Sequence, residues 1–215
     1  MFIDRKDAGI KLAKALNKYK ARNIIVLAIP RGGVEVGFEV AKYLNSDFDI
    51  LISRKLPMPD NSEAGFGAIA EDGSIYLDER ASSWISETEF ERIKSEQLNE
   101  IKRRIKVLRN NTPLQEVKNR IVILIDDGLA MGSTMKASIQ FCRNNKVKGI
   151  VVAVPVAGQD TLEDIKSLVD EIIVLEVPYY FKAVAQIYLN WHDVTDQEVI
   201  EIMNKWALYK DKNRN

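Results

Sequence analysis

The sequence predicts an α/β protein whose parallel sheet is flanked by helices. Two observations predict this class: short β-branched runs that are apolar at most positions, and stretches between them with helical spacing of apolar residues. Alternation of this kind is typical of right-handed βαβ crossovers, with helices on both faces of the sheet. A length of 215 residues with 46% hydrophobic content allows one sizeable core.

The strands of this sheet are predicted at residues 24–29, 48–52, 121–125, 150–154 and 172–175. Helices are predicted between them at residues 34–44, 135–142 and 161–169. Two longer amphipathic helices are expected at residues 86–108 and 195–208, the second with Thr195 as N-cap and Glu198 at the capping-box position.

The alternation stops between residues 56 and 77, where prolines, glycines and Asp60-Asn61 gather. We expect a long mobile loop there, leading into a hairpin with short strands around Ala68 and Ile75. The α/β core is assigned to residues 1–177. Residues 178–215 are expected to form a small hood segment and a C-terminal helix that packs on the core.

Composition excludes several classes of function. Lysine plus arginine (31) balances aspartate plus glutamate (31), so no excess charge favours nucleic acid or an anionic membrane. The single cysteine, Cys142, cannot form an internal disulfide and is expected to be buried, and His192 leaves too few soft ligands for zinc. No window approaches the roughly 18 apolar residues of a membrane span, so we expect a cytoplasmic protein.

The strongest functional signal lies between Ile121 and Thr134. A fully apolar run ends in Asp126 and Asp127, a loop of mostly small residues follows, and hydroxyl residues open a helix. Carboxylates at the end of a central strand lie where open α/β sheets bind ligands, and an adjacent pair can accept hydrogen bonds from two ribose hydroxyls. Residues 130–134 can direct backbone N–H groups at a phosphate. Each piece alone has a plainer explanation, a turn or an N-cap; together they indicate a ribose 5-phosphate site.

This stretch resembles the signature of the type I phosphoribosyltransferases: an apolar strand, two acids, three variable positions, Thr or Ser, Gly, one position, and Thr or Ser. The matching residues are Asp126, Asp127, Gly132 and Thr134. The resemblance implies that the acids hold the ribose hydroxyls of 5-phosphoribosyl 1-pyrophosphate and that the loop holds its 5-phosphate. The expected substrate-binding residues of this stretch are Asp126, Asp127, Gly128, Ala130, Met131, Gly132, Ser133 and Thr134.

Two residues qualify the resemblance. Met131 stands where the family usually has a hydroxyl, and we expect weaker phosphate binding in consequence. Ala130 gives an Asp-Asp-x-x-Ala order that resembles the adenine enzymes, a hint of a purine base.

Two further segments resemble the family. The turn with Arg31, Gly32 and Gly33 resembles its pyrophosphate loop, and Arg54 with Lys55 resembles the basic start of its flexible loop. The alternatives are a plain strand-to-helix turn and a charged surface loop. The turn lacks both the G-x-G-x-x-G spacing of a dinucleotide fingerprint and the lysine of a P-loop. Arg31, Asp126 and Asp127 are the residues that we expect to be catalytic.

Nearly the whole chain resembles a poorly characterised branch of this family, through residues 54–69, 181–188 and 194–199. The resemblance implies transfer of the pentosyl group ribose 5-phosphate to a small nitrogenous base, with release of pyrophosphate. It also implies Mg²⁺ bound through the pyrophosphate, and a homodimer.

Alternatives stay open at this stage. The chain could be a non-catalytic regulator that senses the ligand through a degenerate site, or a hydrolase or phosphotransferase whose acids bind metal directly. The aromatic residues between Pro178 and Trp191 could stack on the base or form a small core.

Overall fold

The computed structural model describes residues 1–20 and 22–212. Its main sheet has five parallel strands in the order β2-β1-β6-β7-β8. The strands are β1 (Ile24–Ala28), β2 (Asp47–Ile50), β6 (Ile121–Ile125), β7 (Gly149–Val156) and β8 (Glu171–Glu176). The interior strands β1, β6 and β7 are buried at nearly every position, which explains their continuous apolar sequence. The predicted α/β class is confirmed.

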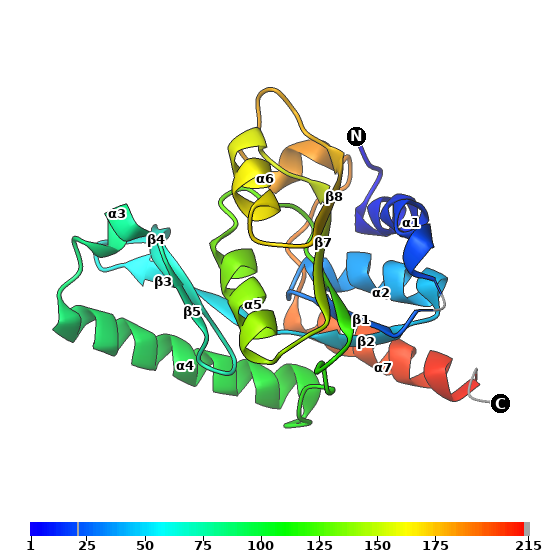
Figure 1. Ribbon diagram of the computed structural model, residues 1–215, viewed down its shortest axis with the longest axis horizontal. Helices are drawn as coiled ribbons and strands as arrows, with labels where there is room; N and C mark the ends of the chain where they lie inside the picture. Colours follow the sequence, from blue (N-terminus) through cyan, green and yellow to red (C-terminus); the bar gives the residue numbers. More distant parts are fainter. Residues whose placement is uncertain (21, 213–215) are drawn as a thin grey trace.

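Helices cover both faces of this sheet (Figure 1). One face packs against α1 (Arg5–Ala15), α2 (Gly33–Leu44) and α7 (Asp196–Lys212). The other packs against α5 (Ser133–Asn144) and α6 (Gln159–Lys166). Cys142 is buried among the apolar residues of the second face, as predicted. Two short 3₁₀ helices, η1 (Asn17–Tyr19) and η2 (Val184–Ile187), lie in the connections.

The two long helices form where the sequence predicts them. Ser86 caps α4 (Glu87–Arg109) by accepting a hydrogen bond from the backbone N–H of Glu89. Thr195 and Glu198 form the expected capping box at the start of α7, with the Thr195 N–H donating to Glu198 Oε2 at 2.7 Å and the Glu198 N–H to Thr195 Oγ1 at 3.2 Å. None of the helices in the described ranges combines the length and apolar character that a membrane span requires.

A second, antiparallel sheet lies to one side of the core, over α4 (Figure 1). Its strands are β3 (Ser53–Met58), β4 (Asn61–Ala70) and β5 (Ile75–Leu77), followed by the short helix α3 (Glu79–Ser82). Most of the segment predicted as a mobile loop is therefore strand, although the hairpin is confirmed. Its glycines mark close strand contacts, since a Cβ on Gly67 would lie 2.3 Å from the backbone oxygen of Tyr76.

The strand order creates one crevice suited to a ligand. From β1 the chain crosses to β2 on one side, and from β6 it crosses to β7 on the other, while β1 and β6 are neighbours with Ala28 opposite Ile125. Open parallel sheets bind ligands outside the carboxyl ends of strands at such a switch point. The turn after β1 and the acids after β6 meet there.

Candidate active site

The two acids lie directly against the glycine turn that follows β1. A Cβ on Gly32 would come within 1.9 Å of Asp127 Oδ2, and one on Gly33 within 2.7 Å of the Ile125 carbonyl oxygen. Only glycine allows the turn to approach the end of β6 this closely. The structure thus brings together the two segments that the sequence presented as separate signals.

Arg5 also contacts Asp127, and sequence reasoning missed it. The Arg5 side chain is 3% exposed and donates from Nε to Asp127 Oδ2 at 2.7 Å. Its other end donates to the backbone oxygen of His192 at 2.9 Å, and the guanidinium lies 4.0 Å from the centre of the Trp191 ring. The available signal was an arginine at helical spacing with the buried residues Ala8 and Leu12 of α1.

Burial and neighbouring charges affect the pKa values of the two acids differently. Burial and the charge of Asp127 raise the pKa of Asp126 well above its usual range. Burial also raises the pKa of Asp127, but the Arg5 guanidinium opposes that rise. The Asp127 backbone N–H donates to Asp126 Oδ1 at 2.9 Å, and the Tyr188 hydroxyl donates to the Asp127 backbone oxygen at 2.7 Å. The pair is thus held rigidly, with Asp127 the member better able to stay ionised.

The predicted phosphate loop turns sharply into α5. Gly132 is its N-cap and has φ of 74°, a left-handed conformation that favours glycine. Thr161 fixes the loop from α6 by donating to the Ala130 backbone oxygen at 2.7 Å. The N-cap has no side chain to accept the first N–H groups of α5, so these can serve an anion. Met131 is 63% exposed, and Ser133 and Thr134 are half-buried.

The basic residues expected at the pyrophosphate lie on different elements. The side chain of Arg31 is 40% exposed beside the crevice. Arg54 and Lys55 are consecutive residues of β3 and not the start of a loop, so their side chains point to opposite faces of the small sheet. Arg54 faces α4, where its Nε donates to Gln97 Oε1 at 3.2 Å. Strand alternation directs the Lys55 side chain to the other face of β3. Arg54 and Lys55 therefore cannot both face Arg31.

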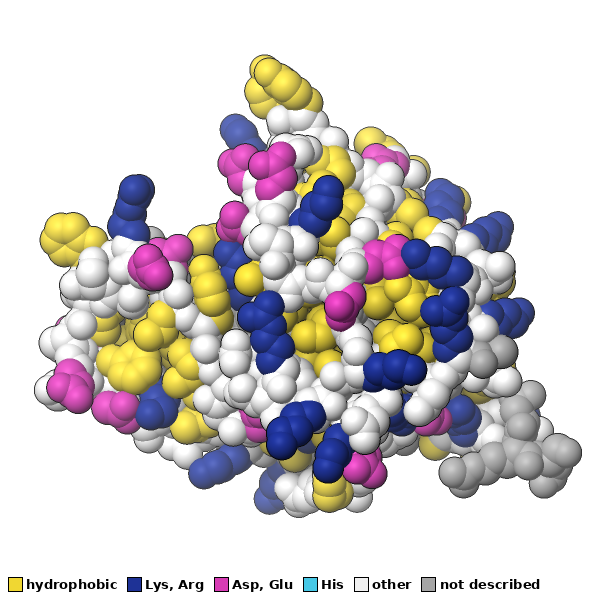
Figure 2. Space-filling view, viewed as in Figure 1, with side chains coloured by type: hydrophobic (Ala, Val, Ile, Leu, Met, Phe, Trp, Pro, Cys, Tyr) yellow, Lys and Arg dark blue, Asp and Glu magenta, His cyan; other side chains and the backbone are white. Residues whose placement is uncertain are grey.

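The aromatic residues of the predicted hood divide into two groups. Tyr188 is buried, and Trp191 packs on both Tyr188 and Arg5, which supports the small-core interpretation for these two. Tyr179 and Tyr180 are 91% and 81% exposed. They lie on the loop after β8, which projects at the top of Figure 1, and Figure 2 shows hydrophobic side chains at this tip. A cleft of roughly 460 Å³ lies between Tyr179, Phe181 and the start of α6, and it reaches Ala130 of the phosphate loop.

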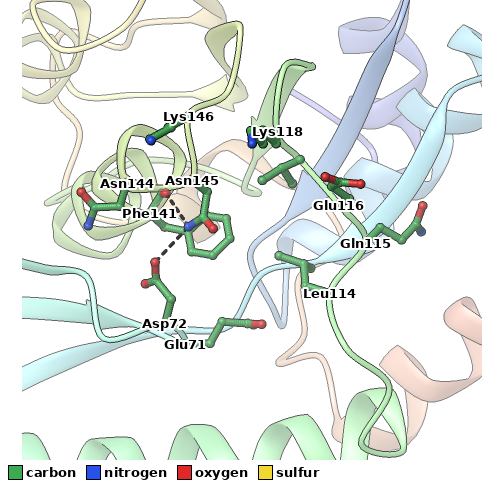
Figure 3. Close-up of a pocket in the computed structure, with 11 residues that line it drawn as sticks. Glu71, Asp72, Leu114, Gln115, Glu116, Lys118, Phe141, Asn144, Asn145 and Lys146 are labelled. Carbon is green, nitrogen blue, oxygen red and sulfur yellow. Dashed lines mark hydrogen bonds between the residues drawn. The ribbon is translucent and has the colours of Figure 1, made fainter.

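A larger cleft, of roughly 570 Å³, lies at the other edge of the main sheet. Lys118 precedes β6 and Lys146 precedes β7, so the cleft is at the amino ends of these strands. In Figure 3, Asn145 connects its walls by donating to Asp72 Oδ2 at 3.0 Å and to the Phe141 backbone oxygen at 2.9 Å. Ligands of open parallel sheets bind at the carboxyl ends, so this cleft is not the candidate site.

The acid pair fits a magnesium ion held mainly by substrate oxygens. Mg²⁺ in proteins is commonly bound through one or two carboxylates together with phosphate oxygens and water. The protein already uses one oxygen of each acid, because Arg5 donates to Asp127 Oδ2 and the Asp127 N–H donates to Asp126 Oδ1. Substrate oxygens would therefore supply most of the ligands of the ion. Across the described ranges, no three His, Cys, Asp or Glu side chains gather as a metal cluster. Asp126 and Asp127 are the residues that would assist such an ion.

An acid pair, a glycine turn and a phosphate loop at the switch point of a parallel sheet are the arrangement expected of a phosphoribosyltransferase. The family model described as phosphoribosyl transferase domain matches residues 4–186, and the chain belongs to this family.

Two comparisons extend this assignment. The chain is 36% identical over 207 residues to the Mycobacterium tuberculosis H37Rv protein named "Putative phosphoribosyl transferase Rv0571c". The match covers 95% of this chain and 47% of that protein, so the chain spans about half the length of its curated relatives. Among solved structures, TT1426 from Thermus thermophilus is 36% identical, with a TM-score of 0.83 and coverage of 96% of this chain and 99% of TT1426.

Proposed function

We propose that the chain transfers ribose 5-phosphate from 5-phosphoribosyl 1-pyrophosphate to a nitrogenous base and releases pyrophosphate. One observation carries the proposal: the acid pair lies between the glycine turn after β1 and the phosphate loop before α5. A phosphorylated ribose needs contacts to its hydroxyls, its 5-phosphate and its leaving group. These three segments offer such contacts around one crevice.

The chemistry asked of the protein is mainly positioning and electrostatic stabilisation. Displacement of pyrophosphate leaves positive charge on the ribose in the transition state, which a nearby carboxylate stabilises. Asp127 suits this role because the Arg5 guanidinium favours its ionised form. The N–H groups at the start of α5 would hold the 5-phosphate, and Arg31 with the glycine turn would hold the leaving group. When bound, Mg²⁺ would supply charge neutralisation at the diphosphate.

The base is assigned to the cleft beside Ala130. Its walls include Phe181 and Tyr179, and a planar base gains stabilisation by stacking on such rings. Ala130, whose place in the Asp-Asp-x-x-Ala order resembles the adenine enzymes, lines this cleft and supports a purine as the base. The cytoplasmic location and the homodimer expected from the sequence stay predictions.

Met131 favours a second candidate function, a regulator that binds the ligand without turning it over. A thioether replaces the hydroxyl that the family usually directs at the 5-phosphate, and the side chain is 63% exposed. Product formation separates the two functions, because both require the ligand to bind.

The test is calorimetric titration of the protein with 5-phosphoribosyl 1-pyrophosphate, with and without Mg²⁺, followed by a screen of bases for pyrophosphate release. Binding that depends on Mg²⁺ and release with one base would establish the transferase. Binding without release from any base would favour the regulator. No binding by a folded protein would refute both.

Asp127→Asn is expected to lose ribose recognition and with it phosphoribosyl transfer. Because this change also removes the partner of Arg5, circular dichroism must show that the variant is folded. Full transfer activity in the folded variant would contradict the role given to the acid pair.

A further inference from the structure

Four arginines from three elements gather next to the glycine turn. Arg31 follows β1, Arg54 lies on β3, and Arg103 and Arg104 lie on the C-terminal half of α4. Burial first, and then the charge of Arg104, lower the pKa of Arg54, and the charges of Arg31 and Arg103 act in the same direction. The charge of Glu100 opposes this shift. Ion pairs show the proximity directly, because Asp196 lies between Arg31 and Arg103 and Glu100 lies between Arg103 and Arg104. Arg54 lies against the same helix through its hydrogen bond to Gln97.

The acids within reach do not balance this charge. Among the described residues, the carboxylates that form ion pairs with the cluster belong to Glu100 and Asp196. Glu100 serves two arginines, at 2.7 Å to Arg103 Nε and 2.9 Å to Arg104 Nε, and they lower its pKa to about 2. Clustered like charges disfavour folding unless an anion compensates them. The excess positive charge indicates a site for a multiply charged anion.

Asp196 is the poorly held member of the cluster. It is the first residue of α7, and its carboxylate lies 3.5 Å from an Arg31 nitrogen and 3.6 Å from an Arg103 nitrogen. Good ion pairs between arginine and an oxygen anion are about 2.7–2.9 Å long. Asp196 Oδ1 is buried and receives no hydrogen bond. A single carboxylate therefore lies between two guanidinium groups without satisfying either.

We propose that Arg103 and Arg104 bind the diphosphate together with Arg31 and Arg54, and that the diphosphate displaces Asp196 from between Arg31 and Arg103. A diphosphate offers more oxygens and more charge than one carboxylate, and guanidinium groups bind such oxygens in pairs. The identity of the anion rests on the proposed function, which places the pyrophosphate of the donor at the adjoining glycine turn.

The proposal gives the small antiparallel sheet of β3, β4 and β5 a part in binding the diphosphate. Figure 1 shows that α4 runs beneath the small sheet and on towards α7. The helix contacts β3 and β4 of the small sheet and also α7 of the main core. Through Arg103 and Arg104, this helix would connect the small sheet to the leaving group. Displacement of Asp196 would act on the start of α7, next to the Thr195–Glu198 capping box.

The test is calorimetric titration of the full chain with inorganic pyrophosphate and Mg²⁺. Loss of one charge-assisted contact weakens binding by about 10- to 100-fold, and we expect this for Arg103→Met and Arg104→Met. Arg92→Met is the matched control, because Arg92 lies about three turns earlier on α4 and forms an exposed pair with Glu96. Its affinity should equal that of the wild type.

Asp196→Asn should have the opposite effect and tighten pyrophosphate binding severalfold, because it removes the competing charge. Glu201→Gln, a neutralisation on the same helix, controls for net charge and should change little. Unchanged binding in Arg103→Met, weaker binding in Asp196→Asn, or no pyrophosphate binding by the wild type would overturn the inference.

The inference and the proposed function can fail separately. Arginine-dependent binding of pyrophosphate by a protein that does not bind 5-phosphoribosyl 1-pyrophosphate would support the inference and refute the function. Equal phosphoribosyl transfer by the wild type and Arg103→Met, at limiting donor, would support the proposed function and refute the inference.

Discussion

Arg5 and Asp127 form a buried ion pair across 122 residues of sequence, with Nε 2.7 Å from Oδ2. The pair joins the first helix of the chain to the acid that follows β6, and Trp191 and the His192 carbonyl hold the arginine in place. One acid of the pair is thereby neutralised by the protein itself. Among residues 1–20 and 22–212, no cationic side chain forms an ion pair with Asp126, so the two adjacent carboxylates have different chemistry.

Arg5→Met should destabilise the protein strongly. Removing one partner of a buried pair leaves the other charge uncompensated, at a cost of about 3–5 kcal/mol in the free energy of unfolding. Urea denaturation measures this. Lys11→Met on the same helix is the control, since the exposed Lys11–Asp7 pair contributes less than about 1 kcal/mol.

The loss of stability caused by Arg5→Met should also depend on pH. Without the guanidinium, the pKa of Asp127 rises further above its usual range, so the folded variant loses stability as pH rises. The difference from the wild type should therefore be larger at pH 8 than at pH 4. A deficit that is constant over this range would mean that Arg5 acts through packing alone.

Asp126→Asn should stabilise the protein at neutral pH. Burial and Asp127 raise the pKa of Asp126, and an acid whose pKa is raised on folding stabilises the protein at low pH and loses that contribution as pH rises. The amide removes this penalty, and single stabilising substitutions commonly gain about 0.5–2 kcal/mol. The amide oxygen can still accept from the Asp127 N–H.

The stability gained by Asp126→Asn should shrink as pH falls towards the range where Asp126 is protonated in both the folded and the unfolded state. Thermal unfolding at pH 7 and at pH 4 measures it, and the same variant should lose donor binding. A variant less stable than the wild type at pH 7 would show that the carboxylate of Asp126 contributes to folding.

The sequence predicted the elements and the local motif but not the contacts between distant segments. Apolar runs and helical spacing predict the main sheet and its helices because these patterns report burial within a single element. The glycines of β4 predict a loop when the sequence is taken alone, because their use in close strand contacts depends on the partner strand. Arg5 carries no local motif, and only the packing of α1 on the crevice makes it part of the site.

Gly32→Ala should disrupt the crevice. The added Cβ would lie 1.9 Å from Asp127 Oδ2, and Arg5 restrains that carboxylate from moving. We expect a loss of about 1–3 kcal/mol in stability from overpacking and a loss of donor binding. Gly149→Ala is the control, because its nearest neighbour would be 3.5 Å away, and the change should stay within about 0.5 kcal/mol. Equal donor affinity in Gly32→Ala would show that the turn is remote from the ligand.

Met131→Thr should tighten binding of the donor if residues 130–134 hold its 5-phosphate. A hydrogen bond contributes about 0.5–1.5 kcal/mol, which corresponds to roughly a 2- to 10-fold gain in affinity. The exposed position of Met131 allows the change with little effect on stability. Met131→Val has the shape of threonine without its hydroxyl, so its affinity should match that of the wild type in calorimetric titration. Equal affinities for the threonine and valine variants would place the phosphate outside this loop, because only a phosphate in the loop can distinguish a hydroxyl from a methyl group at residue 131.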